Sequence, residues 1–71
     1  IYISGTADIT SIIAALEGRR VTLIFTGTAA TNGVVDGSNL KLAGNLAYTP
    51  DDSLTLLSDG TNWFEVSRSV N

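Results

Sequence analysis

Glycine is the feature that most limits what this chain can form. Seven glycines, at positions 5, 18, 27, 33, 37, 44 and 60, interrupt the sequence at intervals typical of turns. The runs between them are rich in β-branched and aromatic residues, which favour strands. Many short strands separated by turns indicate an all-β domain. We therefore expect a small domain of short antiparallel strands and hairpins.

The clearest strand is expected at residues 20–26, "RVTLIFT". Alternation along this strand places Val21, Leu23 and Phe25 on one face, and Thr22 and Ile24 on the other. Both faces are therefore at least partly apolar. Further strands are expected at residues 1–4, 33–39, 39–45, 53–57 and 63–67.

One segment has a different pattern. "SIIAALEG", residues 11–18, places Ile12, Ile13 and Leu16 at helical spacing, with Ser11 as an N-cap and Gly18 just beyond the end. The segment is too short to be a stable helix by itself. We therefore expect one short helix or turn near residues 11–17, packed on the sheet.

Residues 54–66 predict a hairpin whose turn is Asp59–Gly60. In that register Leu56 pairs with Trp63, and Thr55 pairs with Phe64. The hairpin of a monomer with one exposed face alternates apolar and polar residues, but here both faces are largely apolar. Part of the covering is therefore expected from another chain. One face carries Leu54, Leu56, Trp63 and Glu65, and the other carries Thr55, Leu57, Phe64 and Val66.

The chain also lacks the usual means of stabilising a small fold. A domain of 71 residues buries a marginal core, and the absence of cysteine excludes disulfides and thiolate zinc sites. Charged residues make up 15% of the chain, against about 25% in typical globular proteins. Association with other copies is the compensation that remains. The residues expected in the core or in a subunit interface are Val21, Leu23, Ile24, Phe25, Leu40, Leu42, Leu54, Leu56, Leu57, Trp63, Phe64 and Val66.

Few residues in the chain have side chains suited to catalysis or metal binding. There is no histidine to act as a general base or metal ligand, and Asp51 and Asp52 are read as turn residues after Pro50 rather than as a carboxylate pair. We expect no catalytic residue, no metal site and no cofactor. A net charge of −3 argues against nucleic acid and anionic membranes as partners. No apolar run is long enough to insert into a membrane.

Trp63, the only tryptophan, leaves an alternative open. A lone tryptophan in a small β domain is more often structural, and we read it as packing against another element. The competing hypothesis is a carbohydrate-binding module that recognises glycans by stacking a sugar on an aromatic ring. Its glycan-contacting residues would be Trp63, Tyr48, Asn62 and Asp59.

Four pieces of the chain, taken in order, carry a resemblance: "GRRVTLIF" at 18–25, "DGSNLKLAG" at 36–44, "DSLTLLSDG" at 52–60 and "NWFEVSRS" at 62–69. This series resembles the C-terminal module of bacteriophage tail spike and tail appendage proteins. Such proteins often carry a right-handed parallel β-helix of the pectate-lyase-like type ahead of the module. Residues 11–18 depart from the family pattern, in which a more open turn is expected before "GRRVTLIF".

The resemblance implies a homotrimeric, β-rich end-cap that aids assembly of the spike and contacts the host surface. Residues 1–71 would form one C-terminal trimerisation module in the virion. Its partners would be identical chains, an upstream β-helix domain of the same spike, and host-surface polysaccharide. A start at Ile1, inside an expected strand, suggests a piece of a longer polypeptide.

Overall fold

The protein forms one mixed five-stranded sheet and contains no helix. The computed structural model describes all residues from 1 to 71, and the all-β prediction is confirmed. The strands follow the spatial order β1-β2-β4-β5-β3. Their bounds are β1 Tyr2–Ile3, β2 Arg20–Phe25, β3 Leu40–Lys41, β4 Ser53–Ser58 and β5 Trp63–Ser69.

The prediction of purely antiparallel pairing holds only in the middle of the sheet. β2, β4 and β5 pair antiparallel, but β1 runs parallel to β2 and β3 runs parallel to β5. Parallel neighbours need a long crossover connection, and the segments after β1 and β3 supply it. The strand expected at 33–39 is absent, and the strand expected at 39–45 is reduced to β3.

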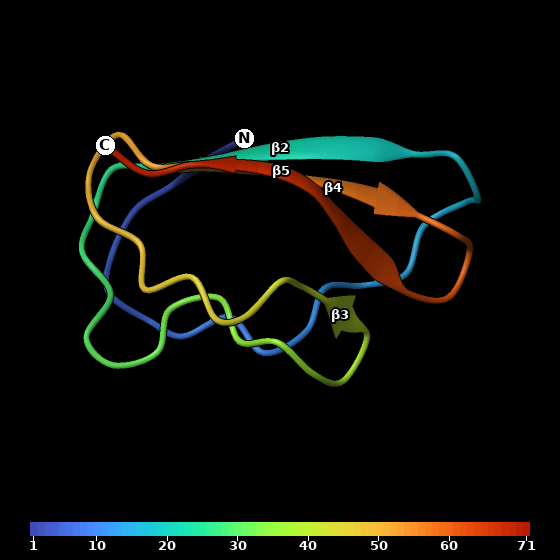
Figure 1. Ribbon diagram of the computed structural model, residues 1–71, viewed down its shortest axis with the longest axis horizontal. Helices are drawn as coiled ribbons and strands as arrows, with labels where there is room; N and C mark the ends of the chain where they lie inside the picture. The colour runs from blue at the N-terminus through green and yellow to red at the C-terminus, as the bar shows by residue number, and fades with distance from the viewer.

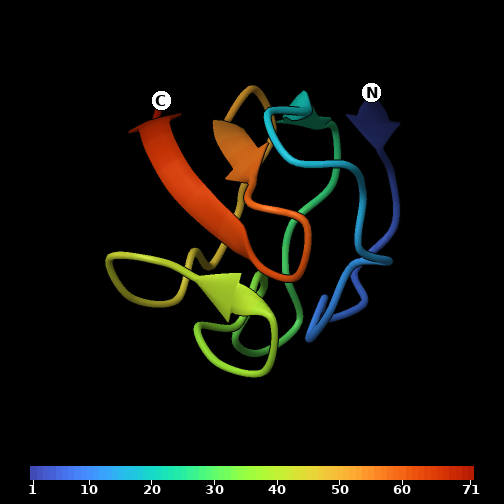
Figure 2. The same ribbon diagram turned by 90° about the vertical axis from the view of Figure 1, so that its right-hand side faces the viewer.

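The molecule has two layers, a sheet and a layer of loops. Figure 1 shows β2, β4 and β5 along one side, with β3 and the connecting segments on the other side. The view turned by 90° in Figure 2 shows the same loops under one face of the strands only. No segment of the chain covers the opposite face.

The core lies between the sheet and the loops. Leu54 and Leu56 of β4 are fully buried there, because alternate residues of a strand point to the same face. Phe25 of β2 stacks on Tyr48 with ring centroids 4.3 Å apart and planes at 14°. The Tyr48 hydroxyl donates a hydrogen bond to the carbonyl of Ala7, so this ring fastens two loops to the sheet. The buried apolar residues are Leu23, Phe25, Val34, Leu40, Leu46, Tyr48, Leu54, Leu56 and Trp63.

The helix considered for residues 11–17 is wrong. A helix would use each carbonyl to accept the amide four residues later. Here the carbonyl of Ile13 accepts Nε1–H of Trp63 at 3.1 Å, and the carbonyl of Ala15 accepts the Ser58 hydroxyl at 3.0 Å. Only a turn at Glu17–Gly18 closes the segment. The side chains of distant residues therefore hold this segment extended.

The loop of the hairpin is longer than predicted. It has four residues, Asp59 to Asn62, and Ser58 pairs with Trp63. The cause is Asp59, whose Oδ1 accepts the amides of Thr61 at 2.9 Å and Asn62 at 2.7 Å. The register moves by two positions, so Leu56 and Trp63 still share the core face as predicted.

Candidate interaction surface

One face of the sheet has no other part of the chain packed against it. We call it the open face. Two apolar groups lie at its opposite corners: Tyr2 beside Ile24, and Leu57 beside Phe64. Tyr2 is 74% exposed, Phe64 42% and Val66 47%, whereas Ile24 and Leu57 are half-buried. The register places these residues on the open face: Tyr2, Arg20, Thr22, Ile24, Lys41, Ser53, Thr55, Leu57, Phe64, Ser67 and Ser69. Val66 lies between Phe64 and Ser67 in β5 and has no register partner.

Hydroxyl groups separate the two apolar corners. The side chains of Thr22 and Thr55, which pair across β2 and β4, lie within hydrogen-bond distance at 3.1 Å between their Oγ1 atoms. The strand residues of this face include no carboxylate, and Arg20 and Lys41 are its only charged members. The face is therefore weakly charged and partly apolar, which is the character of a surface that packs against protein.

The predicted interface or core residues are divided between the two faces. The structure buries Leu23, Phe25, Leu40, Leu54, Leu56 and Trp63 inside the chain. Val21 and Leu42 are half-buried and pack on that core. Ile24, Leu57 and Phe64 lie on the open face instead, and Val66 is exposed without a register partner in β5.

A bulge in β5 decides which residues face the loops. The register changes between Thr55 and Leu56, so that Leu56 opposes Glu65 and Leu54 opposes Arg68. Val66 is the extra residue of this bulge. Without it, positions 65 and 68 would fall on opposite faces of a regular strand. The bulge therefore brings Glu65 and Arg68 together on the inner side.

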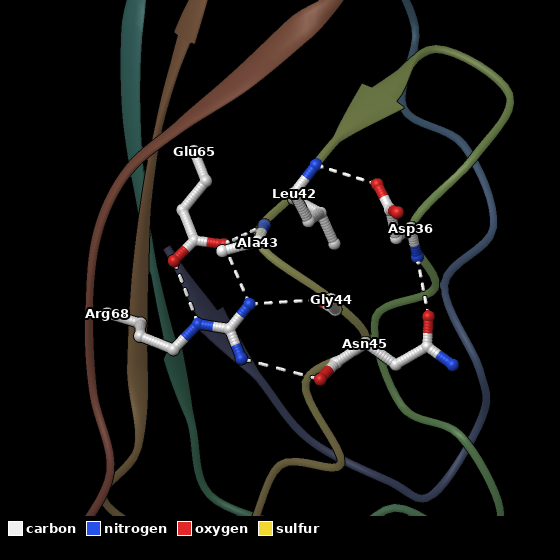
Figure 3. A network of polar contacts seen from close by, with 7 residues as sticks. All are labelled: Asp36, Leu42, Ala43, Gly44, Asn45, Glu65 and Arg68. Atoms are coloured by element: carbon white, nitrogen blue, oxygen red, sulfur yellow. Dashed lines mark hydrogen bonds and ion pairs between the residues drawn. The ribbon is translucent and has the colours of Figure 1, made fainter.

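Glu65 and Arg68 form a clamp between β5 and the loop after β3 (Figure 3). Arg68 donates from Nη2 to Glu65 at 2.7 Å and to the carbonyl of Gly44 at 2.8 Å. A carboxylate oxygen of Glu65 also accepts the amide of Ala43 at 3.0 Å. The Arg68 hydrogen bonds lower the pKa of Glu65 despite its partial burial, and Glu65 in turn raises the pKa of Arg68. This pair holds structure in place and has no free group for chemistry.

The clamp continues through the loop itself. Asp36 accepts the amide of Leu42 at 2.8 Å, and its own amide donates to the side-chain carbonyl of Asn45 at 2.8 Å. Figure 3 shows these residues as one chain of polar contacts leading to Glu65 and Arg68. The network joins residues 36–45 to β5 without a helix or long strand.

The carboxylates of Asp8 and Asp52 bind backbone groups in the same way. The Thr31 hydroxyl and the amides of Gly33 and Asn32 donate to Asp8 and lower its pKa. Burial alone would raise the pKa of Asp52, but hydrogen bonds from Asn71 and Thr49 lower it by more. No group of three or more metal-ligating side chains is present. Asp8 and Asp52 therefore stabilise the loops that they contact.

The residues of the carbohydrate hypothesis do not form an exposed platform. Trp63 is 4% exposed and Tyr48 is 1% exposed, so both rings lie in the core. Asp59 is at the surface, but its Oδ1 is used by the amides of the hairpin loop. Asn62 is half-buried in that loop. A sugar cannot stack on a ring that the chain itself covers.

Sequence reasoning missed several residues that organise the loops. Asn39 is the clearest case, because its side chain accepts the Ile12 amide at 3.3 Å and donates to the Ile12 carbonyl. It also missed that Ile13 and Leu16 are 91% and 76% exposed. The available signal was the wealth of Asn, Asp and Ser in the loops, since these side chains readily bond to backbone groups. Their partners, however, are distant in sequence.

Comparison with known proteins found no relative of this chain. No protein-family model, no curated protein and no solved structure matches the chain. None of its segments forms a helix with the length and apolar character of a membrane span.

Proposed function

We propose that the chain is a trimerisation and stability module at the C-terminus of a phage tail spike or fibre. The observation that carries the proposal is the open face, on which no element of the chain lies. The exposed apolar side chains Tyr2 and Phe64 of this face, together with the exposed Val66 of the β5 bulge, would be covered by the neighbouring copies. The number three and the place in a spike are supported by the resemblance that the four sequence pieces carry in their order along the chain.

The gain from covering these side chains can be estimated from their exposure. Tyr2, Phe64 and Val66 expose 74%, 42% and 47% of their surface, which together is less than two whole side chains. At about 1.5–3 kcal/mol per buried side chain, each copy gains roughly 2–5 kcal/mol. Ile13 and Leu16, at 91% and 76% exposed, offer a similar amount if they are covered too. Association costs are of comparable size, so a stable trimer uses both groups.

A module of this kind suits a spike. In that setting the partners are two identical chains and a β-helix domain that precedes the module, and the location is the virion. Interlocked copies slow unfolding, which protects a particle outside the cell. Contact with host-surface polysaccharide is the additional role that the resemblance suggests. Trp63 and Tyr48 do not supply it, because both are buried.

The test is the solution mass, measured by light scattering after size-exclusion chromatography across a hundredfold dilution. The expected mass is about 22 kDa, three times the 7.4 kDa of one chain. The double variant Phe64→Ser/Val66→Thr should dissociate at concentrations where the unchanged chain does not. Val70→Thr is the matched control, because Val70 is 66% exposed but follows the end of β5. A monomer at every concentration of the unchanged chain overturns the proposal.

A further inference from the structure

Asn32 and Gly33 form the only Asn-Gly pair in the chain. In such a pair the main-chain nitrogen of the glycine can attack the side-chain amide carbon of the asparagine, because glycine has no Cβ to hinder the approach. The bond between the glycine nitrogen and Cγ forms, the Cγ–Nδ2 bond breaks, and ammonia leaves with the proton that the glycine nitrogen gives up. Water then opens the cyclic imide and leaves aspartate or isoaspartate in place of asparagine.

The nitrogen that this reaction needs is held by a carboxylate from a distant loop. Asn32 is exposed to solvent, whereas Gly33 is buried. The Gly33 amide donates to Oδ1 of Asp8 at 2.8 Å, across 25 positions of sequence, and the Asn32 amide donates to the same oxygen at 3.1 Å. The second oxygen of Asp8, Oδ2, accepts the Thr31 hydroxyl at 2.6 Å. The pair is therefore accessible to water through its side chain but not free at its main chain.

The charge of Asp8 also opposes the reaction. The glycine nitrogen attacks after it loses its proton, and it then carries a negative charge. That charge would develop 2.8 Å from a carboxylate oxygen, where a like charge and the loss of the hydrogen bond both disfavour ionisation. The hydrogen bond from Thr31 and those from the two amides lower the pKa of Asp8, so this carboxylate is a weak base for removing the proton. Asp8 therefore blocks the nitrogen rather than activating it.

The main chain beyond Gly33 is fixed as well. The Gly33 carbonyl accepts the Ile9 amide at 2.8 Å, and Val34 exchanges two hydrogen bonds of 2.8 Å with Leu46. The Gly33 backbone lies so close to Leu46 that a Cβ on Gly33 would be 2.0 Å from the Leu46 carbonyl oxygen. Ring closure must bring the Gly33 nitrogen to bonding distance of Asn32 Cγ, and the bonds on both sides of this peptide resist that movement.

We propose that Asn32 is the deamidation site of this chain and that Asp8 suppresses the reaction while the contact with Gly33 is closed. The hydrogen bond between Asp8 and Gly33 must open before the glycine nitrogen attacks. The rate at Asn32 therefore follows the opening of this contact and not the exposure of the asparagine side chain. The inference concerns a loop away from the open face and does not depend on the proposed function.

The test is incubation of the full 71-residue chain in mildly alkaline buffer. Mass spectrometry of the peptide that contains Asn32 measures deamidation, and enzymatic methylation of isoaspartate confirms the product. The folded chain should react at Asn32 about tenfold or more slowly than the same chain unfolded in guanidinium chloride, because several hydrogen bonds must first open. Asp8→Ala should accelerate the reaction of the folded chain by about fivefold or more, the factor expected for one lost hydrogen bond.

Two further variants separate the carboxylate from a general loosening of the loop. Thr31→Val is the matched control, because it removes the bond to Oδ2 but leaves the Gly33 bond to Oδ1, so its rate should stay close to that of the unchanged chain. Asp8→Asn keeps an oxygen acceptor without the charge and should react at an intermediate rate. Hydrogen exchange of the Val34 amide, which donates to Leu46, reports whether the loop stays folded in each variant.

Four outcomes would overturn the proposal. The folded chain could react as fast as the unfolded chain, or another residue could deamidate first. Asp8→Ala could react no faster than the unchanged chain, which would show that the carboxylate does not protect the nitrogen. Finally, exchange at Val34 could accelerate in both Asp8 variants by as much as deamidation does, which would assign the protection to the folded loop and not to Asp8.

Discussion

The two hydrogen bonds between the Asn39 side chain and the Ile12 backbone offer the sharpest test of how the loops are held on the sheet. The Asn39 side chain accepts the Ile12 amide at 3.3 Å and donates to the Ile12 carbonyl, across 27 positions of sequence. The Asn39 side chain therefore pairs with the amide and the carbonyl of Ile12 in the way that a neighbouring strand would. Asn39→Ala removes both bonds but keeps the Asn39 carbonyl, which accepts the Trp63 amide at 2.7 Å.

The expected cost follows from the number and burial of the lost bonds. A neutral hydrogen bond contributes about 0.5–1.5 kcal/mol net, so two contribute roughly 1–3 kcal/mol. Both partners are half-buried, so water replaces the side chain only in part. For a domain of this size this is a large share of the free energy of unfolding. With a urea m-value of about 1 kcal/mol/M, the midpoint should fall by about 1–3 M.

The assay is urea unfolding followed by Trp63 fluorescence, at one fixed chain concentration because association changes apparent stability. Asn32→Ala is the matched control, since Asn32 is exposed and only its backbone amide is bonded, to Asp8. That variant should stay within about 0.5 kcal/mol of the unchanged chain. Hydrogen exchange of the Ile12 amide should also accelerate in Asn39→Ala. Equal midpoints for the two variants would refute the reasoning.

Three further predictions concern other parts of the loop layer. Gly33→Ala should cost about 3 kcal/mol or more, because φ is 76° and a Cβ would lie 2.0 Å from the carbonyl oxygen of Leu46; Gly18→Ala, at a φ of 86° with no atom within 4 Å, should cost about 1 kcal/mol, and thermal unfolding compares the two. Tyr48→Phe keeps the ring stack but loses the hydroxyl bond to Ala7, so calorimetry should record a loss of about 1 kcal/mol. The folded state lowers the pKa of Glu65 from its ordinary 4.5, so the Glu65 contribution is present above pH 4.5 and is lost as pH falls through the lowered pKa. Glu65→Gln should therefore be less stable than the unchanged chain at pH 7 by about 1–2 kcal/mol, and this gap should narrow as pH falls below 4.5; a gap that stays constant as pH falls through the lowered pKa would contradict the assignment.

The sequence determined the parts of the fold that depend on local chemistry. Alternation predicted the central strand at residues 20–26 and placed Leu23 and Phe25 on its core face, where both are buried. The Asp59–Gly60 pair located the hairpin turn, and the faces of Leu56 and Trp63 were correct. These features succeed because a strand repeats every two residues and a turn is set by a few neighbours. The two-sided apolar pattern likewise anticipated a face that the chain leaves uncovered.

Tertiary structure alone decided the rest, because the deciding partners are distant in sequence. Residues 11–18 have helical spacing, yet Trp63 and Ser58, 50 and 43 positions away from their acceptors, hold the segment extended. The β5 bulge and the parallel edge strands depend on how the loops return, which no local pattern states. The burial of Trp63 has the same origin, since its indole is covered by that extended segment. A local pattern can specify which residues prefer a face, but only the closed chain specifies what lies against it.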